Sequence, residues 1–315
     1  MLSAGHQVTV TGRNIRIGEK LEKAGMHFIR ADLSNRDATL AACAGQDYVF
    51  HCGALSSPWG KYDDFYQGNV LGTRYVTEGC LQHQVKRLIH VSTPSIYFSF
   101  TDRINVSEQD PLPRRFVNHY ASTKYLAEQE VQRGFSQGLP VVIIRPRALF
   151  GPGDTSIIPR LIRANEKGFV PLIGDGQALL DVTYVENVVD ALLLCMDAPE
   201  QALGNAYNIT NGQPVRLKAL LDMLFQRMSQ PFHGRNIPYR LAYGLAGALE
   251  AAAKLAGGGK EPILTRYSVG VLAKSQTLDI TAARTDLGYA PGITIEEGID
   301  RFVEWWKNGG GQGEI

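Results

Sequence analysis

The sequence has little of what marks several other classes of protein. Its 315 residues include only four cysteines, Cys43, Cys52, Cys80 and Cys195, and none forms a C-x-x-C pair or a metal-ligand spacing with histidine. Neither a disulfide framework nor a metal site is therefore predicted, and the cysteines are expected to be reduced thiols. The net charge is only +1, so there is no charge bias toward nucleic acid.

Long apolar runs are missing as well. The first residues lack a charged segment followed by an apolar core, so no signal peptide is predicted. The most apolar stretch, Pro238 to Gly257, is interrupted by Arg240, Glu250 and Lys254, and is too polar for a membrane span. We expect it to form core or to cover a substrate pocket, with attachment to a membrane surface as the lesser alternative. Together with the reduced thiols, this predicts a cytoplasmic protein.

Short apolar strands alternate with amphipathic helical segments up to about residue 150, which is typical of a parallel sheet with crossover helices. The expected strands span residues 8–11, 28–31, 48–52, 88–92 and 141–145, and the expected helices 37–43, 69–82 and 119–137. Beyond residue 151 we expect a helix over 157–167, a strand over 205–209 and a helix over 217–228. The prediction is an α/β domain over 1–150, a smaller α+β lobe over 151–308 and a disordered tail over 309–315.

Tyr120 and Lys124 stand four residues apart in the helix expected over 119–137, so they share one helix face. A tyrosine has a pKa near 10, and a nearby cation is needed to favour the phenolate before it exchanges a proton with a substrate. Lys124 could supply that charge, although an ordinary exposed helix face is the alternative. His51, His90 and His119 show no partner pattern and are expected to be structural.

The strand expected over 88–92 runs into a cluster of hydroxyls that includes Ser92, Thr93 and Ser95. Ligands of open α/β sheets bind at the carboxyl edge of the strands. Thr93, with Ser92 as second choice, could therefore donate a hydrogen bond to the same substrate oxygen that Tyr120 protonates. An ordinary Ser/Thr turn is the alternative.

Thr93, Tyr120 and Lys124 together resemble the catalytic triad of the extended short-chain dehydrogenases/reductases, in the NAD-dependent epimerase/dehydratase superfamily. Further segments resemble motifs of that family in the same order, namely 47–54, 69–73, 108–113, 145–154 and 181–188. The resemblance implies a Rossmann-type, doubly wound parallel sheet and a nicotinamide dinucleotide cofactor. By family analogy alone, the helices over 69–82 and 119–137 would form the interface of a homodimer.

One motif of that family is absent, because no G-x-x-G-x-x-G occurs near the start. The opening residues resemble the end of the family's first helix followed directly by its second strand. In the family, these glycines let the backbone approach the cofactor pyrophosphate. The first strand is central in the family's strand order 3-2-1-4-5-6, so its absence would leave strands 2 and 3 without an inner neighbour. We therefore expect an internal start within a longer protein, with a non-catalytic homologue as the alternative.

The resemblance places eight residues at the cofactor: Arg13, Asp32, Leu33, Gly53, Ala54, Tyr120, Lys124 and Pro146. Arg13 stands where a carboxylate would favour NAD, so NADP is slightly favoured over NAD. Asp32 would hydrogen-bond the adenine, and Lys124 would bind the nicotinamide ribose. The alternatives are a plain surface arginine at 13 and a turn aspartate at 32.

The substrate is suggested by the residues before Tyr184. Leu179–Asp181 offers no cation for the diphosphate of a nucleotide sugar. The segment resembles instead the 3β-hydroxysteroid dehydrogenase group and its bacterial relatives that reduce β-keto acids. We therefore expect an NAD(P)-dependent oxidoreductase that interconverts a secondary alcohol and a ketone on a hydrophobic, steroid-like or β-keto acyl substrate.

Two more residues are expected to line the substrate, Ser95 and Tyr184, and Asn69 is expected to support a proton-relay water or to brace its helix. Two other functions stay open. One is a nucleotide-sugar epimerase or dehydratase, and the other is a non-catalytic, dinucleotide-binding homologue.

Overall fold

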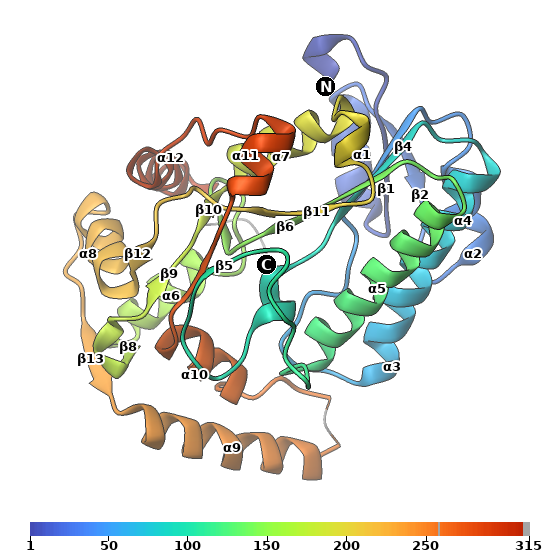
Figure 1. Ribbon diagram of the computed structural model, residues 1–315. Helices are drawn as coiled ribbons and strands as arrows, with labels where there is room; N and C mark the ends of the chain where they lie inside the picture. The colour runs from blue at the N-terminus through green and yellow to red at the C-terminus, as the bar shows by residue number, and fades with distance from the viewer. Residues whose placement is uncertain (258, 311–315) are drawn as a thin grey trace.

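The computed structural model describes residues 1–257 and 259–310, and its centre is a sheet of four parallel strands (Figure 1). The strands follow the order β11-β6-β4-β3, namely β11 (Ala206–Ile209), β6 (Val141–Pro146), β4 (Arg87–Val91) and β3 (Tyr48–His51). In β6 every residue is buried, as expected of a strand that is covered on both faces. All four strands lie where the sequence predicts them, within about one residue.

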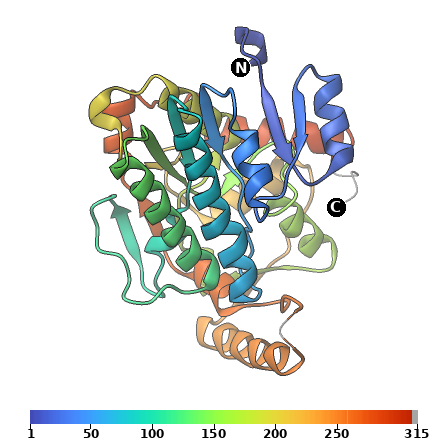
Figure 2. The ribbon, with the colours of Figure 1, turned by 90° about the vertical axis from the view of Figure 1, so that its right-hand side faces the viewer.

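Helices cover both faces of this sheet (Figure 2). One face carries α2 (Arg36–Ala42), α4 (Gly72–Gln82) and α5 (His119–Ser136), and the other carries α7 (Val185–Met196) and α11 (Thr281–Leu287). Successive residues of a strand point to opposite faces of the sheet. Leu88 therefore packs in the apolar cluster under α4 and α5, and Ile89 packs in the cluster under α7. The predicted doubly wound fold is confirmed. The homodimer through α4 and α5 stays a prediction.

The first two strands form a separate sheet. β1 (Thr9–Gly12) and β2 (His27–Arg30) pair in parallel with each other, and α1 (Ile15–Lys23) connects them. Within residues 1–257 and 259–310, neither strand is hydrogen-bonded to β3, as predicted for a pattern that lacks its first strand. Gly18 is needed in α1 because a Cβ there would overlap the Phe28 ring of β2.

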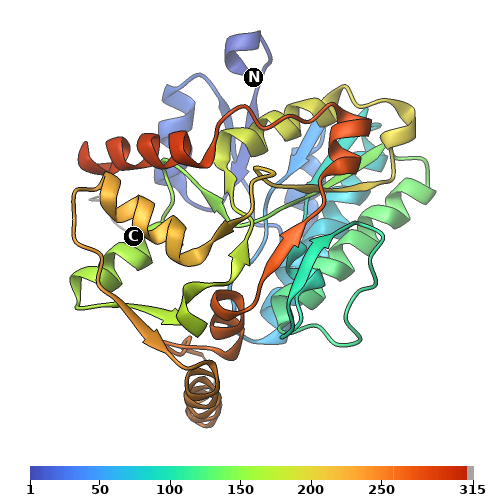
Figure 3. The ribbon, with the colours of Figure 1, turned by 60° about the vertical axis from the view of Figure 1, so that its left-hand side comes forward.

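The second lobe holds a four-stranded sheet in the order β12-β9-β14-β5 (Figure 3). These strands are β12 (Val215–Arg216), β9 (Leu179–Leu180), β14 (Gln276–Leu278) and β5 (Arg103–Val106). Two further parallel pairs join β7 (Leu149–Phe150) to β10 (Thr183–Tyr184) and β8 (Val170–Ile173) to β13 (Gly234–Ile237). The lobe's helices include α6 (Ile158–Glu166), α8 (Leu217–Arg227), α10 (Arg266–Ala273) and α12 (Ile295–Lys307). Outside this lobe, the short helix α3 (Tyr62–Phe65) precedes α4.

The division at residue 150 stays a prediction. The chain after that point returns to the first sheet, because β11 pairs with β6 and α7 packs on its face. Most of the tail predicted to be disordered lies outside the described residues, which end at 310.

The apolar segment after Pro238 forms α9 (Tyr239–Leu255), which lies at the edge of the molecule (Figures 1 and 3). Ala242 and Ala246 are buried against the second lobe, whereas Leu241 is 65% and Leu245 54% exposed. The expectation of core therefore holds for one face only. Within the described residues, no helix combines the length and apolarity that crossing a membrane requires. Attachment to a membrane surface stays a prediction.

Candidate active site

The end of β4 places two of the predicted hydroxyls together. Thr93 caps the short 3-10 helix η3 (Pro94–Tyr97), and its Oγ1 accepts a hydrogen bond from the Ser95 backbone N–H at 3.2 Å. The Thr93 hydroxyl also donates to Ser95 Oγ at 3.0 Å, and Ser95 Oγ lies 3.1 Å from the Tyr267 hydroxyl. Thr93 and Ser95 are buried. The turn thus holds a connected row of hydroxyls at the carboxyl edge of the sheet.

Tyr120 joins this row from the first turn of α5, where Asn118 is the N-cap and accepts from the Ala121 N–H at 2.8 Å. Burial raises the pKa of Tyr120, and hydrogen bonding to the hydroxyls of Thr93 and Ser56 lowers it by less. Tyr120 is therefore a neutral phenol at neutral pH. This corrects the expectation that Lys124 lowers its pKa enough to favour the phenolate.

Lys124 is 2% exposed, and its amine is held under the sheet edge rather than in solvent. Lys124 Nζ donates to the Val91 carbonyl at 2.7 Å and lies 3.4 Å from His90 Nε2. Burial lowers the pKa of Lys124 to about 8, against the opposing charges of Glu128 and Cys52. The predicted cation thus lies at the carboxyl end of β4, and burial disfavours its charged form.

His90 is a partner of Lys124 that the sequence pattern did not indicate. It is fully buried, and burial, together with the charges of Lys124 and His51, places the pKa of His90 well below its ordinary value. A neutral His90 that accepts from Lys124 at Nε2 carries its proton on Nδ1. That Nδ1 atom is buried without a hydrogen-bond partner among the described residues. His90 is therefore neutral, and its Nε2 helps to position the Lys124 amine.

Asn69 lies in a π-helical turn, η2 (Tyr66–Leu71), directly before α4. Its Oδ1 accepts from the Leu55 N–H at 2.6 Å, and its Nδ2 donates to the Leu55 carbonyl at 3.2 Å and to Thr123 Oγ1 at 3.1 Å. Both amide hydrogens are used. These bonds favour the bracing role, because they tie the loop after β3 to α5.

The residues predicted for the adenosine end of a cofactor lie at the ends of β1 and β2. Arg13 Nη1 is 3.8 Å from Asp32 Oδ2, and the two side chains are 79% and 45% exposed. Asp32 Oδ1 also accepts from Ser34 N at 2.9 Å and Ser34 Oγ at 2.8 Å, as in the turn alternative. Leu33 packs toward Gly53, where a Cβ would lie 2.7 Å from Leu33 Cδ1.

The remaining residues predicted for a nicotinamide dinucleotide lie after β3, at the end of β6 and on α5, and their role stays a prediction. Gly53 and Ala54 are exposed after β3, Pro146 is buried at the end of β6, and Lys124 lies beside Tyr120's helix turn. No G-x-x-G-x-x-G turn occurs in the described part of the chain to meet the pyrophosphate.

Tyr184 is not brought to the hydroxyl row. Its side chain is fully buried in the core of the second lobe, with its ring edge-on to Phe150 at 5.6 Å between centroids. Its hydroxyl donates to Glu186 Oε1 at 3.4 Å. Its contacts are those of a core residue, so the predicted substrate contact is not formed by this residue.

Four polar residues were not predicted as site residues: Arg147, Asp181 and Gln276, which are buried, and the half-buried Tyr267, which contacts Ser95 of the row. Arg147 lies within the R-P-x-x-x-x-G-P-G-D segment, and Asp181 lies within the segment before Tyr184. Either position could have suggested a site residue. Tyr267 and Gln276 belong to a distant stretch without a motif, and only the tertiary fold brings them here.

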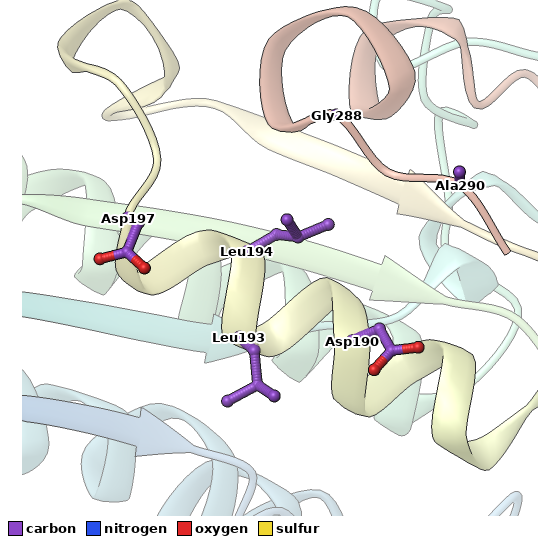
Figure 4. A pocket seen from close by; sticks show the side chains of 6 residues that line it. All are labelled: Asp190, Leu193, Leu194, Asp197, Gly288 and Ala290. Atoms are coloured by element: carbon purple, nitrogen blue, oxygen red, sulfur yellow. The ribbon is translucent and has the colours of Figure 1, made fainter. Parts of the chain in front are cut away.

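A surface hollow lies elsewhere, between α7 and the turn after α11 (Figure 4). Six residues line it: Asp190, Leu193, Leu194, Asp197, Gly288 and Ala290. It contains none of the predicted site residues and offers carboxylates and leucines without a cation or hydroxyl. The hydroxyl row is therefore the better candidate for chemistry.

Replacement of Lys124 by methionine should stabilise the fold. The folded pKa of about 8 lies below the ordinary 10.5, so the unfolded chain binds more protons between these values and stability rises with pH there. At pH 7 this pKa difference corresponds to a gain of about 3 kcal/mol in the free energy of unfolding when the amine is removed. The lost hydrogen bond to Val91 reduces that gain by about 1 kcal/mol. Urea unfolding should show a gain near 2 kcal/mol at pH 7 that shrinks above about pH 8.

Lys86→Met is the matched control. Lys86 is exposed, and its hydrogen bond to Asp47 raises its pKa. Its removal should therefore give no gain at pH 7. A gain for Lys124→Met that stays constant with pH would contradict the titration of a buried amine.

The chain matches the model of the NAD dependent epimerase/dehydratase family over residues 1–210 and belongs to that family. It is 38% identical to "Uncharacterized protein YbjS" of Escherichia coli (strain K12), over 97% of this chain and 92% of the relative. It is 36% identical to a 2-alkyl-3-oxoalkanoate reductase of Stenotrophomonas maltophilia (strain K279a), over 96% and 92%. The family and fold predictions are thereby confirmed.

Two further comparisons concern a more distant relative and a solved structure. It is 30% identical to the sterol-4-alpha-carboxylate 3-dehydrogenase, decarboxylating, of Mus musculus, over 96% of this chain and 85% of the relative. Among solved structures, UDP-glucuronic acid 4-epimerase from Bacillus cereus in complex with NAD is similar with a TM-score of 0.75, 19% identity and coverage of 97% and 92%. At that identity the second likeness concerns the fold alone.

Proposed function

We propose that the protein is an NAD(P)-dependent oxidoreductase that interconverts a hydrophobic β-hydroxy acid and the corresponding β-oxo acid. The observation that carries the proposal is the meeting of the Thr93 and Tyr120 hydroxyls at the carboxyl end of β4, where the buried Lys124 amine binds the Val91 carbonyl. The relatives' names support the substrate class. A 2-alkyl-3-oxoalkanoate and a sterol-4-alpha-carboxylate oxidised at carbon 3 both carry the carboxylate on the carbon next to the reacting one.

The chain's own residues would handle the proton. A bound nicotinamide ring would supply or accept the hydride. Burial raises the pKa of Tyr120, so its hydroxyl stays protonated and can donate a proton to a ketone oxygen in the reductive direction. Thr93 would donate a second hydrogen bond to the same oxygen. Lys124 would stabilise the tyrosinate left after proton transfer and would bind the nicotinamide ribose.

A small apolar cavity lies in the core of the second lobe and is lined by ten residues: Ala148, Phe150, Ile157, Ile158, Leu161, Val182, Leu220, Leu221, Leu224 and Ile299. Its volume is about 50 Å³, against roughly 300 Å³ or more for a ligand pocket. It is therefore a gap in the packing of this core, and the hydrophobic substrate is proposed from the relatives' names.

NADP is proposed as the preferred cofactor. Arg13 is 79% exposed at the end of β1 and can meet a 2′-phosphate, and its 3.8 Å contact with Asp32 is loose. Arg13→Ala should therefore lower kcat/KM for NADP more than for NAD. Equal loss with both nucleotides would contradict this choice.

The proposed function is tested by following nicotinamide reduction with 3-hydroxydecanoate and either NADP⁺ or NAD⁺, with UDP-glucose as a separate substrate. We expect turnover of the hydroxy acid, a higher kcat/KM with NADP⁺ and no conversion of UDP-glucose. Conversion of UDP-glucose without oxidation of the hydroxy acid would favour the nucleotide-sugar epimerase. Nucleotide binding without any turnover would favour the non-catalytic homologue.

A further inference from the structure

Arg147 is a buried cation without a hydrogen-bonded partner. It is 6% exposed and directly follows β6, while Thr93 follows the neighbouring strand β4. In the described part of the chain, its side chain forms no hydrogen bond or ion pair, and its Nε is enclosed without a partner. A charge removed from water in this way costs several kcal/mol unless something compensates it. The mechanism proposed above leaves it unused.

Other unpaired polar atoms lie on the strands around Arg147. Asp181 Oδ2 accepts from the Leu278 N–H at 2.7 Å, but its Oδ1 is buried without a partner. Gln276 stands opposite Leu180 in the sheet and is 2% exposed, and both ends of its amide are unpartnered. Buried polar atoms are almost always hydrogen-bonded, so a group of them indicates a place for a polar ligand or water.

This group is continuous with the hydroxyl row. Tyr267 is hydrogen-bonded to Ser95, and Ser95 to Thr93. Burial lowers the pKa of Arg147, and the nearby Tyr267 and Asp181 raise it by less. The residue after Arg147, Ala148, has a φ of 41°, in the left-handed region that non-glycine residues rarely adopt. Such strain is typical of functional sites. Ala148 also lines the apolar cavity.

We propose that Arg147, assisted by the Gln276 amide, binds the carboxylate of the substrate whose reacting carbon is held by Thr93 and Tyr120. The assignment rests on the proposed function and names the residue that selects acids over neutral ketones and alcohols. Arginine suits this role because its planar guanidinium can bind a carboxylate through two parallel hydrogen bonds.

A structural role with Asp181 is the competing explanation. No nitrogen of Arg147 lies within the 4.0 Å ion-pair distance of an Asp181 oxygen, and Asp181 already uses one oxygen on Leu278. Burial also raises the pKa of Asp181 to about 6, which weakens it as a counter-ion. The two explanations differ in what removal of Arg147 does to the folded protein. Loss of an ion-pair partner destabilises it, whereas loss of an uncompensated charge does not.

The test is calorimetric binding of 3-hydroxydecanoate and of its methyl ester, without nucleotide and with saturating NADPH, to the full chain. The wild type should bind the acid more tightly than the ester. Arg147→Met should weaken the acid at least about 30-fold and leave the ester within about threefold. The affinity of Arg147→Lys for the acid should fall between those of the wild type and of Arg147→Met, because lysine keeps the charge and loses the two parallel hydrogen bonds. Arg16→Met, at an exposed position in α1, should change neither ligand.

Three outcomes would overturn the carboxylate site: no binding of the acid by the wild type, equal weakening of acid and ester, or a lowered unfolding free energy for both Arg147 variants. The last would identify Arg147 as a structural partner of Asp181. Acid binding that depends on Arg147, without hydride transfer to either nucleotide, would support the site while contradicting the proposed function. The failures of the two proposals are thus distinguishable.

Discussion

Tyr120→Phe should lower kcat for 3-hydroxydecanoate oxidation by about 10²- to 10⁴-fold, which is the usual contribution of a positioned acid or base. The ring is retained, so packing around α5 should persist, and only the hydroxyl that meets Thr93 and Ser56 is lost. KM for the hydroxy acid should change little, because Arg147 is untouched. Steady-state kinetics, with circular dichroism as a check on folding, measures this effect.

Tyr125→Phe is the matched control on the same helix. The ring of Tyr125 packs against Phe116 at 5.2 Å between centroids, and the substitution keeps that contact. Its kcat should stay within about twofold of the wild type, as for a change outside the chemistry. If both variants lost activity equally, the loss would come from α5 as a whole and not from the Tyr120 hydroxyl.

The sequence predicts most of the first sheet because local patterns determine it. Parallel strands buried on both faces appear as short apolar runs, such as 141–145, between amphipathic helices. Thr93, Ser95 and Tyr120 could also be predicted together, because two neighbouring elements of such a sheet deliver them to the same edge. Periodicity and topology suffice for these residues.

The rest depends on tertiary contacts that no local pattern encodes. Gln276 and Tyr267 reach the site only because β14 pairs with β9 and α10 packs nearby. The pKa of Tyr120 was expected to be low beside Lys124, yet burial governs it, and burial follows from packing. Tyr184 was expected at the substrate from its place in a motif, whereas its ring completes the core of the second lobe.

Arg145→Met should destabilise the fold by about 3–5 kcal/mol, because it leaves a buried carboxylate without its cation. Arg145 Nε and Nη2 donate to the two oxygens of Glu128 at 2.8 and 2.6 Å, and the side chains are only 10% and 4% exposed. The guanidinium also donates to the Tyr97 hydroxyl. Urea unfolding at neutral pH would measure the loss.

The double variant Arg145→Met, Glu128→Leu should recover most of this loss, since a buried ion pair replaced by apolar groups is often neutral. Lys218→Met is the exposed comparison. Lys218 pairs with Asp222 at 2.7 Å, with side chains 46% and 47% exposed, and its loss should cost less than about 0.5 kcal/mol. Equal costs for Arg145→Met and the double variant would mean that packing, and not the unpaired carboxylate, determines the loss.

The same pair links the stability of the fold to the site. Glu128 lies one helical turn after Lys124 on α5, and its charge raises the pKa of Lys124 against the effect of burial. Arg145 lies on β6, two residues before Arg147, so the ion pair joins the helix that carries Tyr120 to the strand that precedes the proposed carboxylate anchor. The double variant should therefore fold and yet have a lower Lys124 pKa, which a shifted pH profile of its activity would reveal.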